Sequence, residues 1–167
     1  KKAGMLDHTF KLHAAETAFP GAVSASELIQ ESAKKAGIKI QVVREPDDGY
    51  WDSVWIKKEW VQCYWSGRAT ADWMFSTAYT EDANWNDTHW KHPKFNQLIK
   101  AARAELAQNK RREMYVECQQ IVSDEGATPV PAFAMQLSAA SKKMGFENPA
   151  ANWEFDGFRL AERWWFA

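Results

Sequence analysis

The chain has few cysteines, no long apolar run and no excess of charge of either sign. Its two cysteines, Cys63 and Cys118, are too few for a disulfide scaffold and too widely spaced for a zinc knuckle. The apolar runs are a few residues long, whereas a membrane-spanning helix needs about 20. With 21 basic and 22 acidic residues, the chain has no field that would attract nucleic acid or an anionic membrane, so we expect neither as a partner.

The chain is instead rich in apolar and aromatic residues. Of its 167 residues 46% are hydrophobic and 14% aromatic, which excludes disorder and allows a sizeable core. This is the size of one ordinary domain, or of one lobe of a larger protein. The first residue is Lys1, so we expect a processed chain or a piece of a longer one.

The first third of the sequence predicts a β-α-β unit. Apolar residues alternate over residues 9 to 14 and again over 38 to 42, as in strands with one buried face. Between them, residues 25 to 36 have helical spacing, with a capping box formed by Ser24 and Glu27 and a stop at Gly37. Strands joined by such a helix are parallel, with a right-handed crossover.

The remainder adds further helices and strands. We expect a helix over residues 49 to 58, a third strand over 60 to 65, and a long loop over 66 to 92 that contains a helix at 72 to 78. Two amphipathic helices follow, one with Pro93 in its first turn and one capped by Asn109 and ended by Gly126. Residues 128 to 134 read as extended, and 137 to 142 as a short strand. The fold class is therefore α/β, with a mixed sheet flanked by helices.

No motif of a known catalytic or nucleotide site is present. The sequence lacks a glycine-rich dinucleotide or phosphate loop, a Gly-x-Ser-x-Gly elbow and a His-Glu-x-x-His zinc motif. His89 and His92 have metal-ligand spacing, but two ligands are not a site. Cys63 or Cys118 could act as a nucleophile with a histidine, although core packing explains both. We expect no enzyme activity, catalytic residue, cofactor or metal ligand.

A ligand site is predicted at the end of the third predicted strand. Trp65 and Trp73 flank Ser66-Gly67-Arg68 there, and ligands of open α/β sheets bind beyond the carboxyl ends of the strands. Arg68 could hold an anion, or it could pair with Asp72 for structural reasons. Other tryptophans, such as Trp51, are expected to be core anchors. The predicted ligand-binding residues are Tyr64, Trp65, Ser66, Gly67, Arg68, Asp72, Trp73 and Asn86.

Several short stretches, in this order and spacing, carry a resemblance to a known family. They are residues 1 to 4, 27 to 30, 36 to 38, Tyr64-Trp65-Ser66-Gly67-Arg68, Asn84-Trp85-Asn86-Asp87, 93 to 99, 101 to 106, 111 to 115 and Pro129-Val130-Pro131. The chain resembles the C-terminal part of the extracellular solute-binding proteins of family 5, the dipeptide, oligopeptide and nickel type that serve ABC importers. The resemblance extends over essentially the whole chain.

The resemblance implies a two-lobed binding protein of the class II periplasmic type. Residues 1–145 would form an incomplete second lobe, and 146–167 an aromatic tail that packs toward the missing N-terminal lobe. The protein would capture a small-molecule or peptide ligand in the cleft between the lobes and deliver it to a membrane permease. It would be periplasmic, or extracellular and membrane-associated.

The resemblance also bears on the ligand. Peptide binders of this family use a tryptophan and, a few residues later, an aspartate that holds the peptide amino group. Here Trp65 matches the tryptophan, but Arg68 stands where the aspartate would fall. A guanidinium suits a carboxylate better than an ammonium, so a peptide-like or carboxylate-bearing solute is expected. A carbohydrate-binding module and a carrier of metal or metal chelate remain the alternatives.

Overall fold

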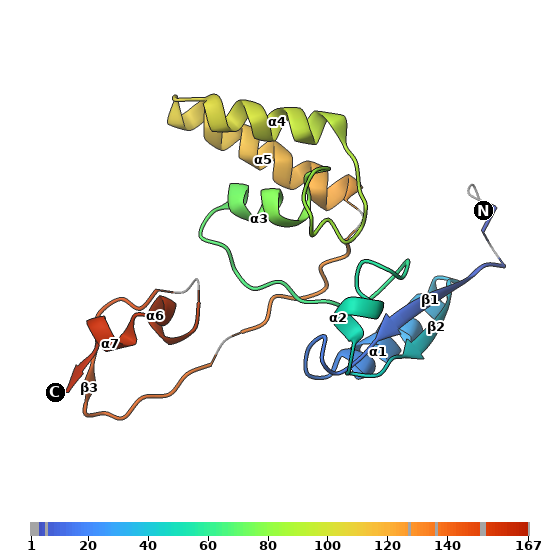
Figure 1. Cartoon of the computed structure of the whole chain (residues 1–167), viewed down its shortest axis with the longest axis horizontal. Helices are drawn as coiled ribbons and strands as arrows, with labels where there is room; N and C mark the ends of the chain where they lie inside the picture. The colour runs from blue at the N-terminus through green and yellow to red at the C-terminus, as the bar shows by residue number, and fades with distance from the viewer. Residues whose placement is uncertain (1–3, 6, 127, 136, 151–152, 167) are drawn as a thin grey trace. The chain divides into compact units, whose positions relative to one another are not determined.

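The structure is a computed structural model that describes residues 4–5, 7–126, 128–135, 137–150 and 153–166. The chain divides into two compact units, Lys1–Trp65 and Ser66–Ala167. Each unit is described by itself (Figure 1). Among the described residues, no helix combines the length and the apolar character that crossing a bilayer requires.

The first unit is built on a parallel β-α-β arrangement, as predicted. Strands β1 (Thr9–Ala14) and β2 (Lys39–Arg44) pair in parallel, and helix α1 (Ala22–Lys35) connects them. The helix starts before Ser24, so the predicted capping box is wrong. Instead, the Glu16 carboxylate accepts hydrogen bonds from the backbone N–H groups of Gly21 (2.6 Å) and Val23 (3.4 Å). An acidic side chain from the preceding turn thus binds the N–H groups that a capping residue would bind.

The core of this unit lies between α1 and the segment that follows β2. It consists of buried residues that are mostly small, namely Ala15, Ala18, Ala22, Tyr50 and Val54. Tyr50 is 1% exposed, and its hydroxyl donates a hydrogen bond of 2.7 Å to the Gln62 carbonyl oxygen. Burial raises the pKa of the Tyr50 phenol well above its usual value, so this group stays a neutral donor.

The predicted second helix and third strand are both shorter than expected. Helix α2 spans only Tyr50–Ser53, and the backbone turns at Ile56, whose φ is 62°. A left-handed φ at a β-branched residue cannot continue a helix. In place of a strand over residues 60 to 65, one parallel bridge joins Val61 to His13, and the Gln62 N–H donates to the His13 carbonyl oxygen (2.9 Å).

The second unit contains a group of three helices, as the apolar stripes predict. These are α3 (Ala71–Ala78), α4 (Pro93–Ala104) and α5 (Gln108–Glu125). Their shared core is Phe75, Phe95, Ile99, Cys118 and Ile121. Pro93 occupies the first turn of α4, and α5 ends at Gly126, both as expected. The predicted cap by Asn109 is wrong, because α5 starts at Gln108 and Asn109 lies within its first turn.

The rest of the second unit has little regular structure. The described residues between 128 and 140 form neither helix nor strand, so the strand predicted over 137 to 142 is wrong. Strand β3 (Met144–Gly145) pairs antiparallel with β4 (Trp165–Phe166), and short helices α6 (Glu154–Phe158) and α7 (Leu160–Arg163) lie between them in the sequence. The α/β class is confirmed. In the described part of the chain, the parallel and antiparallel strand pairs belong to two separate two-stranded sheets.

Candidate functional site

Two of the eight predicted binding residues lie at the end of the first unit. Tyr64 is 61% exposed, and its ring meets that of Trp51 edge-on at 5.8 Å between centroids. Trp65 makes a similar contact with Trp55 at 6.2 Å. The aromatic groups after β2 therefore pack on one another, which supports the expected role of Trp51 as a packing anchor.

The Ser66-Gly67-Arg68 segment, which has no regular secondary structure, opens the second unit, and the Arg68 side chain folds back over it. The Arg68 Nη1 donates to the Ser66 carbonyl oxygen (3.0 Å) and to the Ser66 hydroxyl (2.9 Å). The guanidinium carbon lies 5.6 Å from the centre of the Trp73 ring, which is a cation–π arrangement. Arg68 is thus held on an aromatic face next to the glycine, in a half-buried position.

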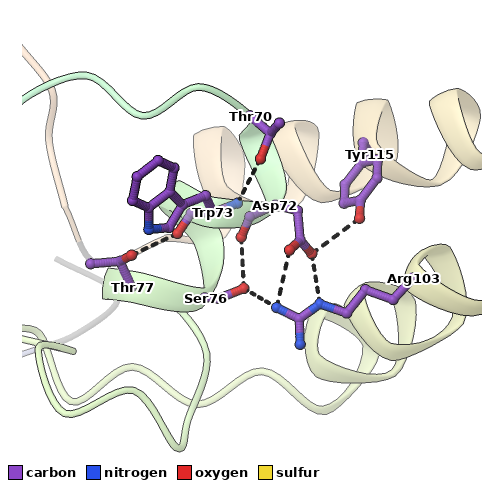
Figure 2. Close-up of polar contacts among 7 residues, drawn as sticks. All are labelled: Thr70, Asp72, Trp73, Ser76, Thr77, Arg103 and Tyr115. Atoms are coloured by element: carbon purple, nitrogen blue, oxygen red, sulfur yellow. Dashed lines mark hydrogen bonds and ion pairs between the residues drawn. The ribbon is translucent and has the colours of Figure 1, made fainter.

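Trp73 lies in the first turn of α3 and contacts both Arg68 and Trp153 of the C-terminal segment. Thr70 caps this helix, because its hydroxyl accepts a hydrogen bond from the Trp73 N–H (3.2 Å; Figure 2). The Trp73 ring is 45% exposed and meets Trp153 edge-on at 6.1 Å. The indole N–H of Trp153 donates to the Gly67 carbonyl oxygen at 2.8 Å. The sequence did not single out Trp153, whose only signal was its place in an aromatic tail.

Asp72 faces the helical core of the second unit and binds two other helices (Figure 2). Arg103 of α4 contacts both carboxylate oxygens, through Nε (2.9 Å) and Nη2 (3.1 Å). The Tyr115 hydroxyl of α5 donates to the same carboxylate at 3.0 Å. Ser76 completes the group, since it accepts from Arg103 and donates to the Asp72 carbonyl oxygen (2.6 Å). The structural partner of Asp72 is therefore Arg103, and the group ties α3 to α4 and α5.

These contacts shift the pKa of two of the side chains involved. The hydrogen bonds that Arg103 donates to the Asp72 carboxylate raise the pKa of Arg103 above its usual value, so its charge is permanent. Burial, followed by the hydrogen bond to Asp72, raises the pKa of Tyr115. Both groups therefore remain donors to Asp72 throughout the physiological pH range.

Asn86 is buried and organises its own loop. Its Nδ2 donates to the carbonyl oxygens of Thr80 (3.3 Å) and Trp90 (2.8 Å). Its Oδ1 accepts from the Thr88 hydroxyl (3.1 Å) and the Trp90 N–H (3.2 Å). The side chain is only 7% exposed, so every described polar contact of the amide serves the fold of residues 80 to 90.

Local contacts also determine what the candidate metal ligand His92 and the candidate nucleophile Cys118 do in the structure. His92 caps α4, because its Nδ1 accepts from the Phe95 N–H (3.1 Å), and its Nε2 lies 3.4 Å from a Glu125 oxygen. No group of three or more metal-ligating side chains occurs among the described residues. Burial raises the pKa of the Cys118 thiol to about 11, so this cysteine is not a thiolate nucleophile at neutral pH.

Comparison with known proteins identifies the fold. No protein-family model matches the sequence. No curated protein matches it either. Solved structures do match. DppA from Helicobacter pylori, an ABC transporter-associated periplasmic binding protein in complex with the peptide STSA, has a TM-score of 0.63 at 20% identity, over 75% of this chain and 25% of that one.

Two further matches are proteins solved with nickel complexes. NikA from Staphylococcus aureus with Ni(L-His)2 has a TM-score of 0.59 at 20% identity, over 73% of this chain and 27% of that one. NikZ from Campylobacter jejuni with Ni(L-His) has a TM-score of 0.58 at 19% identity, over 68% and 24%. The chain thus spans about a quarter of the length of these proteins. It has the fold of a part of the substrate-binding proteins of ABC transporters, as the sequence resemblance implied.

Proposed function

We propose that the chain is most of the second lobe of a family 5 solute-binding protein of an ABC importer. The protein captures a small carboxylate-bearing or peptide-like solute between two lobes and delivers it to a membrane permease, without catalysis. The observation that carries this proposal is the shared fold with periplasmic binding proteins over about 70% of the chain. Hinge closure on the ligand would then produce the form that the permease recognises.

The exposed apolar residues after α5 support the view that more protein covers this lobe. Phe133, Met135 and Leu137 are 90%, 85% and 91% exposed, and they alternate along a segment without regular structure. Soluble proteins rarely leave such side chains uncovered, so we infer that the N-terminal lobe packs here and against the tail at residues 146–167. The neighbours' location further suggests that the protein works in the periplasm or on the outer face of a membrane.

Arg68 is the residue on which the ligand class depends. The ligands of the neighbouring proteins are a peptide and complexes of L-histidine, both of which carry a carboxylate. A guanidinium held beside exposed Trp73 can bind a carboxylate by charge-assisted hydrogen bonds while the indole stacks on the ligand. We assign ligand contact to Arg68, Trp73 and the Ser66-Gly67 segment, together with Tyr64 and Trp65. The other two predicted binding residues make internal contacts instead, Asp72 with Arg103 of α4 and Asn86 within the loop of residues 80 to 90.

A metal-chelate carrier is the second candidate, because two of the neighbours were solved with nickel bound to L-histidine. In that case the donors would come mainly from the organic chelator, since the described residues offer no group of three ligating side chains. Metal analysis of the purified protein separates the two candidates. Nickel that is retained only together with an organic acid identifies a chelate carrier.

The test is native mass spectrometry of the full-length protein that contains this chain, followed by release and identification of the bound molecule. Titration calorimetry then measures affinity for the released molecule, for the peptide STSA and for Ni(L-His). Replacing Arg68 with alanine should weaken carboxylate binding by about 1.5–3 kcal/mol, the range for a hydrogen bond to a charged group. The matched control is Arg112→Ala, an exposed arginine on α5, which should bind as the wild type does. Equal affinity of the Arg68 variant and the control would refute the role of Arg68, and a neutral sugar as the only ligand would favour a carbohydrate-binding protein.

A further inference from the structure

The C-terminal segment makes a specific contact with the Ser66-Gly67-Arg68 segment. Trp153 lies 86 residues after Gly67 in the sequence, yet its indole N–H donates to the Gly67 carbonyl oxygen at 2.8 Å. Its ring also meets Trp73 edge-on, with 6.1 Å between centroids. Trp153 therefore contacts the backbone on one side of Arg68 and the aromatic ring on which the guanidinium rests.

The segment that presents Trp153 has a defined structure of its own. Asp156 is 5% exposed, and its carboxylate accepts from the Ala150 N–H (2.5 Å), from Arg163 Nη1 (2.8 Å) and from the Trp164 indole N–H (3.1 Å). The backbone hydrogen bond from Ala150 is the main reason that the pKa of Asp156 is lowered, so the carboxylate is charged at neutral pH. These bonds hold a turn in which Phe155, Asp156 and Phe158 all have left-handed φ values of 49° to 62°.

Such a turn is unfavourable for residues other than glycine, so it needs the contacts that Asp156 provides. Phe158, the last left-handed residue of this turn, packs against Trp153 with 5.7 Å between ring centroids. Contacts within the C-terminal segment therefore hold Trp153 in place independently of its hydrogen bond to Gly67. A side chain that is oriented in this way can restrict the backbone of Gly67, to which it binds.

We propose that Trp153 is a positioning residue that fixes the Ser66-Gly67-Arg68 segment and thereby orients the Arg68 guanidinium on Trp73. This inference rests on the proposed function, because it assumes that Arg68 meets the carboxylate of the ligand. Trp153 itself need not touch the ligand. Its hydrogen bond removes freedom from the glycine backbone, so that less order has to be imposed when the ligand binds.

The first test uses NMR spectra of the full chain, recorded without ligand. The Arg68 Nε–H resonance, identified by its loss in Arg68→Lys, should carry a ring-current shift from Trp73. In Trp153→Ala this resonance should move toward the position of an unstructured arginine. In Trp153→Phe, which keeps the ring and removes the N–H, the displacement should be smaller. The matched control is Trp165→Phe in β4, an exposed tryptophan of the same segment, which should leave the resonance unchanged.

The second test measures affinity for Ni(L-His) and STSA in the full-length protein. Trp153→Phe should weaken binding on the order of fivefold, the equivalent of one net hydrogen bond, with the thermal unfolding midpoint unchanged. In the Arg68→Ala background the same replacement should have no further effect, because Trp153 acts through Arg68.

The two tests fail separately. An Arg68 resonance that is identical in wild type and Trp153→Ala would overturn the positioning role, whether or not any probe binds. Additive effects of the two replacements on affinity would also overturn it. If the resonance shifts as expected but neither probe nor any released molecule binds, the positioning contact stands and the proposed function fails.

Discussion

Replacing Asp72 with asparagine should destabilise the helical part of the second unit. The carboxylate accepts two hydrogen bonds from Arg103 and one from Tyr115, and its side chain is 27% exposed against 50% for Arg103. An asparagine of the same shape keeps one acceptor oxygen, but it loses the charge and turns an amide group toward the guanidinium. The cost therefore includes the lost ion pair and an unfavourable donor–donor contact.

The magnitude follows from the exposure of the two partners. An exposed ion pair is worth about 0–1 kcal/mol, whereas a hydrogen bond to a charged group contributes about 1.5–3 kcal/mol. The Asp72–Arg103 pair is bidentate and joined to Tyr115, but Arg103 is half exposed, so water screens part of the interaction. We therefore expect Asp72→Asn to lower the free energy of unfolding by about 1–2 kcal/mol.

The assay is urea unfolding followed by circular dichroism at 222 nm, which reports mainly on α3, α4 and α5. The control is Asp82→Asn, which removes the same charge from an exposed carboxylate in the loop after α3. Combining Asp72→Asn with Tyr115→Phe should be less than additive, because both act on one hydrogen-bonded group. Equal unfolding midpoints for Asp72→Asn and Asp82→Asn would refute the structural role of Asp72. A loss of ligand affinity without loss of stability would assign Asp72 to the ligand instead.

Two further predictions concern groups with shifted pKa values. Burial raises the pKa of Cys118 to about 11, so iodoacetamide at pH 7.5 should leave this thiol unmodified in the folded chain and label it in urea. Peptide mass spectrometry measures the labelling. Rapid labelling of the folded chain would contradict the view that Cys118 is a buried, neutral thiol. The lowered pKa of Asp156 means that its carboxylate stabilises the C-terminal turn above the usual pKa of an aspartate, and that this stabilisation is lost as the pH falls through the folded-state pKa. Hydrogen exchange in residues 153–166, relative to the intrinsic rate, should therefore rise in acid. Asp156→Asn should remove this dependence on pH. Identical pH profiles of exchange in the wild type and the variant would exclude the role of Asp156.

The alternation of apolar residues was enough to predict the parallel unit at the start of the chain. Strand patterns over 9 to 14 and 38 to 42, separated by one helix, leave few arrangements other than β1 parallel to β2. The two long helices of the second unit were also predicted, because Pro93 specifies where α4 begins and the apolar stripes specify which face each helix buries. These signals are local, with a period set by the backbone.

The predictions failed where a contact from elsewhere in the chain competes with a local signal. Ser24 and Glu27 match a capping box, but the helix starts earlier, at Ala22. There the Glu16 carboxylate accepts hydrogen bonds from the N–H groups of Gly21 and Val23. Residues 60 to 65 have high strand propensity, yet the aromatic rings of Tyr64 and Trp65 pack on Trp51 and Trp55 rather than on a sheet.

The candidate site shows the same division between local pattern and tertiary contact. The sequence by itself determined the α/β class and the main helices of the second unit, and it predicted a ligand site at the Ser66-Gly67-Arg68 segment. Only the tertiary structure decided that Asp72 binds Arg103 and that Trp153 binds Gly67. These partners lie 31 and 86 residues apart, and a hydrogen bond over such a separation depends on how whole elements pack, which no local spacing encodes.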